Sequence, residues 1–426
     1  MKTKKLILAF LVVAFTSPLM AQLQPDLQYS RPNDQRGLNV FETSKVDTVG
    51  YEGIKVRVGG DFALQFQSLD HSNKYNTLID LGSNFNLPTA NLNLDAQLYD
   101  GLRLHLRTYL SSRHHSESWV KGGYLQIDKL DFIKEGFLEG LMDIATIRVG
   151  MDEFGYGDLV YRRSDNARAI YNPFIGNYIM DSFSTEAFGE IIIQKNGFVG
   201  LVGLTNGKLN QSVVINEASD NQPSIYAKLG YDSQINEDLR VRLTGSVYAN
   251  GGETTGQWLY SGDRAGARYY NVMQDTSGAA SDFDSRFSPG FRQMTAIQIN
   301  PFVKFKGLEF FGVYEIVTGK IPPAVANSAL GEGSYTQLGA ELIYRFGANE
   351  NLYVGGRYNM VTGEATKSAD TQDIDRLNIG AGWFMTKNIL VKLEYMNQNY
   401  SGDGWVGSRF EDGYIQGVML EAVIGF

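Results

Sequence analysis

The sequence contains no cysteine, only 4 histidines and only 10 prolines in its 426 residues. Without thiols it can form no disulfide framework, no thiolate zinc site and no cysteine nucleophile. So few imidazoles leave little room for a histidine metal centre, and the formal charge of −9 argues against a nucleic-acid-binding protein. Glycine and aromatic residues are plentiful, with 47 Gly, 24 Tyr and 24 Phe. This composition favours β-structure over helix bundles.

Long apolar runs are also scarce. Near the start, three lysines precede the apolar run 6–15, which is ten residues long. A helix needs about 20 apolar residues to span a bilayer, so this run predicts an export signal over 1–21, with cleavage between Ala21 and Gln22. No later run approaches that length. The exported chain is therefore either a soluble periplasmic protein or a transmembrane β-barrel.

Alternating stretches of roughly ten residues recur from residue 53 to the end of the sequence. We count sixteen of them: 53–67, 88–99, 102–112, 121–130, 143–152, 185–194, 198–206, 223–231, 238–250, 291–305, 308–319, 334–346, 351–362, 375–386, 389–400 and 413–426. Most connections are alternately short, as at 100–101, and long and polar, as at 153–184. Membrane barrels have this pattern of short periplasmic turns and long outer loops. Residues 22–52 do not alternate, and we expect them in the periplasm or the lumen.

Side-chain parity indicates lipid outside and water inside. In the first stretch Ile54, Val56 and Val58 share one face, and Lys55 and Arg57 share the other. A slip of one residue would turn both cations into the lipid. Each basic side chain in the middle of the membrane costs about 2–4 kcal/mol, so the slip costs on the order of 5 kcal/mol in total. The pattern therefore fixes the register. A soluble β-sandwich with one wet face is the competing interpretation.

Aromatic residues favour the membrane barrel over the sandwich. Outward-facing rings end the strands that run toward the periplasm, at Tyr231, Phe305, Phe346, Trp383 and Phe426. Others fall near the outer ends of the returning strands, at Tyr314, Tyr358 and Tyr395. Two girdles at the lipid headgroups result. The last strand ends in Phe426 with apolar residues at alternate positions, like the signal read by the barrel-assembly machinery. We predict an all-β, closed antiparallel barrel of about 16 strands over 53–426.

The predicted lumen carries basic residues that could select anions. Inward positions of the first, third and fifth strands hold Arg57, Arg103, Arg107 and Arg148. The loop 153–184, after the fifth strand, has the length and position of the inward-folded constriction loop of sixteen-stranded porins, and it carries Arg162, Arg163 and Arg168. Guanidiniums that face one gap would bind phosphate, carboxylate or sulfate. Alternatively, the wall charges merely pair with one another, and the loop lies outside, where its arginines contact lipopolysaccharide or Asp158 and Asp181.

The strand number, the stretch RVGMDEFGYGD (148–158) before the long loop, and the terminal Phe resemble outer-membrane porins of the Bacteroidetes type. The sequence is most similar in architecture to the phosphate-selective porin O and P family. That resemblance implies passive, anion-preferring diffusion, often through a trimer. It also implies a place in the outer membrane of a Gram-negative bacterium, among lipid and lipopolysaccharide, without a cofactor.

Three functional hypotheses follow. The first is a general or mildly anion-preferring porin for small solutes, with its constriction at the arginines. The second is a plugged barrel for adhesion or assembly, with 22–52 in the lumen. The third is an outer-membrane barrel enzyme, but His114-His115-Ser116 lies at a predicted loop tip without an orienting acid, so the sequence offers no convincing catalytic group.

Overall fold

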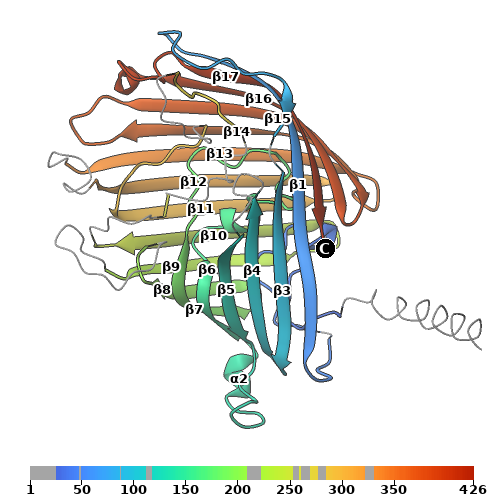
Figure 1. Cartoon of the computed structure of the whole chain (residues 1–426). Helices are drawn as coiled ribbons and strands as arrows, with labels where there is room; N and C mark the ends of the chain where they lie inside the picture. The colour runs from blue at the N-terminus through green and yellow to red at the C-terminus, as the bar shows by residue number, and fades with distance from the viewer. Residues whose placement is uncertain are drawn as a thin grey trace, which may run out of the picture.

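The computed structural model describes residues 25–47, 49–86, 88–111, 118–208, 222–252, 259–260, 269–276, 285–321 and 331–426. In this part of the chain, sixteen long antiparallel strands form one closed sheet (Figure 1). They are β1 (Lys55–Ser72), β3 (Thr89–Tyr99), β4 (Leu102–Ser111), β5 (Ser118–Ile127), β6 (Ala145–Glu153), β7 (Thr185–Lys195), β8 (Phe198–Thr205), β9 (Ser224–Gln234), β10 (Leu239–Asn250), β11 (Gln293–Phe305), β12 (Leu308–Lys320), β13 (Gly333–Phe346), β14 (Leu352–Glu364), β15 (Gln372–Thr386), β16 (Ile389–Ser401) and β17 (Tyr414–Gly425). The predicted fold class is confirmed.

The predicted strand boundaries agree with the structure to within a few residues. The larger differences lie at the outer ends, where β1 continues to Ser72 and β15 begins at Gln372. A two-residue strand that was not predicted, β2 (Asn84–Phe85), pairs with β1. The predicted signal at 1–21, its cleavage point and the His114–Ser116 stretch lie outside the described residues.

The barrel closes where β1 pairs with β17 on one side and with β3 on the other. Gly60 and Phe426 exchange backbone hydrogen bonds of 3.0 and 3.1 Å at this seam. The chain passes so close here that a β-carbon on Gly59 would lie 2.7 Å from the Phe426 carbonyl oxygen. Glycine at position 59 therefore lets the first and last strands meet.

The outer surface is an apolar belt. Outward positions predicted from parity, such as Val56 and Leu243, are exposed, and so are the girdle residues Trp383 and Phe426. Closure pairs the backbone groups of the strands with one another, which a span of the bilayer requires. The belt and the closed sheet together make this chain an outer-membrane type of transmembrane barrel. None of the helices in the described residues has the length and apolar character that a membrane crossing demands.

Parity predicts water inside the barrel, but the outer half of the lumen is filled by apolar side chains. Inward side chains of the wall form a buried apolar cluster there, which includes Met294, Tyr335, Val361, Met396 and Met419. Two loops that fold into the lumen cover it. The loop between β6 and β7 contributes Ile179 and Met180, and the loop between β10 and β11 contributes Tyr269, Val272 and Met273. We call this cluster the outer apolar core. Parity separates inward from outward positions, but it does not show whether an inward side chain meets water or a folded-in loop.

The periplasmic half of the lumen holds two further segments. One is the N-terminal segment, residues 25–52, with the short 3₁₀ turn η1 (Gln35–Gly37). The other is the inner loop, residues 154–184, with η2 (Leu159–Tyr161). Outside the lumen, the short helix α2 (Glu139–Met142) projects beyond the ends of β5 and β6 (Figure 1). A last 3₁₀ turn, η4 (Asp403–Trp405), lies in the loop before β17.

Candidate functional site: an arginine-lined chamber

A cavity of about 160 Å³ lies between the barrel wall, the N-terminal segment and the inner loop, and we call it the chamber. Its lining includes six arginines, namely Arg31, Arg57, Arg103, Arg107, Arg148 and Arg168. Four carboxylates also line it, those of Glu42, Asp95, Asp152 and Glu153. The volume is an order of magnitude above the roughly 10–15 Å³ that one water needs. The chamber can therefore hold a small ion with part of its hydration shell.

Five of the seven predicted constriction arginines line this chamber. Arg57 lies on β1, Arg103 and Arg107 on β4, and Arg148 on β6. They converge because alternate residues of a strand face the same side and neighbouring strands are in register. Arg168 reaches the chamber from the inner loop, which is folded inward as expected from its length.

The wall arginines pair with carboxylates while they line the chamber. On β3, Asp95 lies 3.2 Å from the guanidinium of Arg57 and 3.0 Å from that of Arg103. On β7, Glu190 lies 2.7 Å from Arg148. The interpretation that these charges pair with one another therefore holds for the wall. Pairing satisfies only some N–H groups of each guanidinium, since each has five donors.

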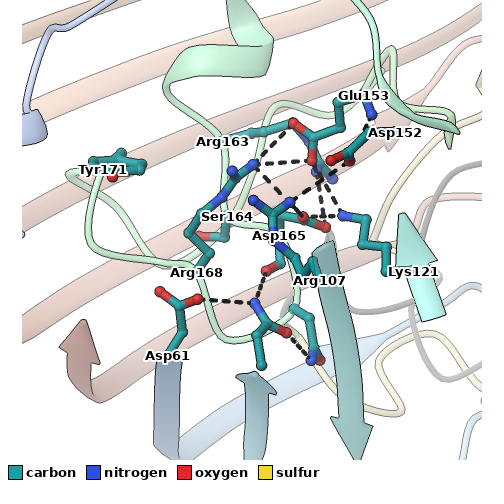
Figure 2. A network of polar contacts seen from close by, with 12 residues as sticks. Asp61, Arg107, Lys121, Asp152, Glu153, Arg163, Ser164, Asp165, Arg168 and Tyr171 are labelled. Carbon is teal, nitrogen blue, oxygen red and sulfur yellow. Dashed lines mark hydrogen bonds and ion pairs between the residues drawn. The ribbon is translucent and has the colours of Figure 1, made fainter. Parts of the chain in front are cut away.

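Asp165 of the inner loop is the centre of the densest charge network (Figure 2). Its carboxylate lies 3.3 Å from Arg107 and 3.7 Å from Arg168, and it contacts Lys121. Burial would raise the pKa of this carboxyl, but Lys121 and the nearby guanidiniums outweigh burial and hold the pKa well below its usual range. Asp165 is therefore ionised at neutral pH and ties the inner loop to β4 and β5.

Glu153, the last residue of β6, is the second acid of this network. It lies 3.0 Å from Arg168, 3.3 Å from Lys121 and 3.6 Å from Arg163 (Figure 2). Asp152 beside it is 3.8 Å from Arg107. The cations and acids at this wall alternate in space, which favours a fixed arrangement of the guanidiniums over mobile ones.

Arg162 and Arg163 are not among the chamber-lining residues. Arg162 donates to Glu309 on β12 at 2.7 Å and to Glu341 on β13 at 3.1 Å. Arg163 forms a bidentate pair with Asp181 of the same loop, at 3.0 and 2.7 Å. Both arginines are almost completely buried. Their carboxylate partners draw them away from the chamber, and there they fasten the inner loop.

The N-terminal segment is held by buried ion pairs that could not be predicted from local sequence patterns. Glu42 lies 2.7 Å from Arg242 and 3.4 Å from Lys228, and Asp158 of the inner loop shares both cations. Burial would raise the pKa of the Glu42 carboxyl, but Arg242 and Lys228 leave it below its ordinary value. Further along, Lys45 lies 3.0 Å from Asp128.

Sequence reasoning missed Lys121 for a specific reason. Its parity in the stretch 121–130 matches Leu125, which predicts an outward side chain. In the structure the β4–β5 register shifts, so that Arg107 pairs with Gly122 while Thr108 pairs with Val120. A bulge of this kind inserts one residue and resets the alternation, and Lys121 is buried against Glu153. Arg31 and Glu42 were missed because their segment has no alternation from which orientation could be inferred.

The described residues contain no group of three or more His, Cys, Asp or Glu side chains arranged to hold a metal ion. The chamber carboxylates have cationic neighbours instead. The chemistry that this geometry offers is the binding of a negatively charged group by guanidinium N–H donors.

No protein-family model and no curated protein matches this sequence. Solved structures do match its fold. The chain is similar to OmpT in trimer form, an outer membrane protein of Vibrio cholerae, with 11% identity, TM-score 0.50, and coverage of 88% of this chain and 100% of that one. It is also similar to an anion-selective porin from Comamonas acidovorans, with 10% identity, TM-score 0.50, and coverage of 88% and 100%. A third match is the outer membrane channel DcaP of Acinetobacter baumannii, with 10% identity, TM-score 0.51, and coverage of 88% and 99%. At these identities the likeness concerns the fold.

Proposed function

We propose that the protein is an outer-membrane porin for passive diffusion of small solutes, with a mild preference for anions. One observation carries this proposal: six arginines and four carboxylates line a chamber in the lumen of a closed barrel. Cations in a narrow space with low-dielectric walls raise the local concentration of anions. Two proteins of similar fold are titled an anion-selective porin and an outer membrane channel.

The preference is mild because the arginines are largely paired. Each wall pair lowers the field that a passing ion experiences, yet the lining keeps an excess of two positive charges when His105 is neutral. The path is also narrow, since the N-terminal segment and the inner loop both occupy the lumen. We therefore expect small conductance and exclusion of large solutes.

The remaining features of this proposal come from the sequence. The chain is exported by the signal at 1–21, and Phe426 marks the last strand for the assembly machinery. The barrel lies among lipid and lipopolysaccharide and associates as a homotrimer. Arg162 and Arg163 influence the constriction by holding the inner loop, and Arg168 does so from the lining. We infer transport without catalysis, because the acids of the chamber are occupied by cations.

The outer apolar core supports a second candidate, a plugged barrel for adhesion or assembly. Loop residues such as Met180 and Tyr269 are completely buried against the wall there. A plug packed in this way favours a closed lumen. Flux of small solutes separates the two candidates.

Liposome swelling tests the porin proposal. Vesicles that contain the purified protein are placed in isotonic solutions of small anionic, neutral and cationic solutes of similar size. We expect swelling with all three and the fastest swelling with the anion. An Arg168→Gln variant should lose part of this preference, while Arg36→Gln, which alters an exposed residue of the N-terminal segment, should keep it. Absence of swelling with every solute would favour the plugged barrel.

A further inference from the structure

Arg31 of the N-terminal segment is a cation without an acidic partner. It donates to the carbonyl oxygens of Gly37 at 2.8 Å and of Tyr161 at 3.0 Å, and its guanidinium stacks on the Tyr171 ring at 3.7 Å. Among the residues that the structure describes, no carboxylate forms an ion pair with it. Burial lowers the pKa of this guanidinium to about 10, so Arg31 still carries its charge at neutral pH. Arg31 is partly buried, and a cation in a narrow space with low-dielectric walls attracts a negatively charged group.

Three other arginines that line the chamber each have a donor without an acceptor. The Nε atoms of Arg103, Arg148 and Arg168 are buried and find no hydrogen-bond partner within the described part of the chain. All three residues line the chamber, and the Arg103 side chain is only 5% exposed. Buried N–H groups are rarely left unpaired in proteins. Of the six arginines that line the chamber, Arg31 alone has no carboxylate partner among the described residues, and a negatively charged acceptor inside the chamber would balance its charge.

The protein's own acids do not supply this acceptor. Asp95 is engaged by Arg57 and Arg103, and Glu42 is engaged by Arg242. Toward the inner loop, Glu153 lies against Arg168 at 3.0 Å. A small anion in the chamber can instead meet the guanidinium of Arg31, and the chamber has room for it.

We propose that the chamber binds one small oxyanion, which bridges Arg31 to the arginines of the wall and the inner loop and thereby fastens the N-terminal segment in the lumen. Sulfate, phosphate and short carboxylates share the required chemistry of several acceptor oxygens on one negative centre. This goes beyond passage of solutes, because here the anion acts as a resident ligand that controls how often the segment leaves. It holds whether or not ions flow through the barrel.

The linkage between anion binding and release of the N-terminal segment gives the expected decrease in the rate of release. A ligand that binds only the form with the segment in place makes release rarer by the factor 1 + [L]/Kd. At a ligand concentration of about 100 Kd, release should slow about 100-fold.

The absence of cysteine from the sequence allows a clean test. Leu27 is a buried residue of the N-terminal segment, 3% exposed, so the thiol of a Leu27→Cys variant reacts with a bulky maleimide only after the segment moves. The rate of labelling is measured for the full-length protein in detergent at neutral pH, with rising sodium sulfate and with sodium chloride at matched ionic strength. We expect sulfate to slow labelling in a saturable way and chloride to have a much weaker effect.

Matched variants and a second measurement complete the test. Adding Arg31→Gln should abolish the saturable effect of sulfate, whereas adding Arg36→Gln should preserve it, since Arg36 is exposed and pairs with Asp34. Calorimetric titration of the unlabelled protein with sulfate should give one site that Arg31→Gln removes. Labelling that ignores sulfate, or an Arg31→Gln variant that responds like the parent, would overturn the proposal.

Discussion

At the scale of single residues, the lumen shows how buried charge is made tolerable. Arg163, for example, has two hydrogen bonds to the Asp181 carboxylate and a side chain that is only 2% exposed. Removing one member of such a pair leaves an uncompensated buried charge, which costs far more than the loss of a surface pair. Arg163 therefore holds the inner loop in place.

We expect Arg163→Ala to lower the free energy of unfolding by about 3–5 kcal/mol. Arg36→Ala is the matched control, since its side chain is 58% exposed, and it should change the free energy by about 0–1 kcal/mol. Denaturant titration of both variants in lipid vesicles measures the difference. Equal effects would show that Arg163 is solvated, contrary to the structure.

The Glu42 carboxyl predicts acid release of the N-terminal segment. Its pKa in the folded protein is below the ordinary 4.5 because Arg242 and Lys228 outweigh burial. A carboxyl whose pKa is lowered in the folded protein stabilises the fold at pH values above its ordinary pKa. This contribution is lost as the pH falls through the pKa of the folded protein. A spin label at Val40→Cys should therefore be immobile at neutral pH and become mobile as the pH falls through the lowered pKa of Glu42.

A matched pair of variants checks that Glu42 is the cause. Glu42→Gln should free the label already at neutral pH, because it leaves two cations without their partner. Glu52→Gln, at a position where the exposed acid pairs with Lys55, should behave like the parent. A label that is equally immobile in both variants at neutral pH would contradict this role of Glu42.

At the scale of elements, alternation in the sequence was enough to find every long strand, and the length and position of the loop after β6 predicted its inward fold. It failed where a strand departs from regular pleating, as at the bulge that turns Lys121 inward. It also failed in the N-terminal segment, where Arg31 and Glu42 take their orientation from tertiary contacts alone. The pairing of Arg162 with β12 and β13 spans more than a hundred residues, so no local pattern could indicate it.

The register of β10 can be tested by placing an arginine at two different depths in the membrane. Leu243 faces lipid near the middle of this strand, whereas Phe305 faces lipid at the periplasmic end of β11. Leu243→Arg should cost about 2–4 kcal/mol in free energy of folding, and Phe305→Arg only about 0–1 kcal/mol. Folding titrations in phosphatidylcholine vesicles give both values. A reversed order would mean that the belt is misplaced relative to the membrane.

At the scale of the whole molecule, closure of the sheet and an apolar exterior determine where the protein resides, and the contents of the lumen determine what passes. The closed sheet and its apolar exterior follow from sequence periodicity and are confirmed by the structure. What passes through the lumen depends on how the N-terminal segment and two folded-in loops pack against the inner wall. That packing joins residues that are distant in the sequence, which is why the sequence predicted most of the arginines of the chamber but not the apolar core above it.

The most direct test of the central claim is the reversal potential of single channels in a KCl gradient. A barrel whose chamber carries more arginines than carboxylates should give a small conductance with a reversal potential that favours chloride. Arg168→Gln should move this potential toward zero. A reversal potential that favours potassium, or a reconstituted protein that passes no current, would contradict the account.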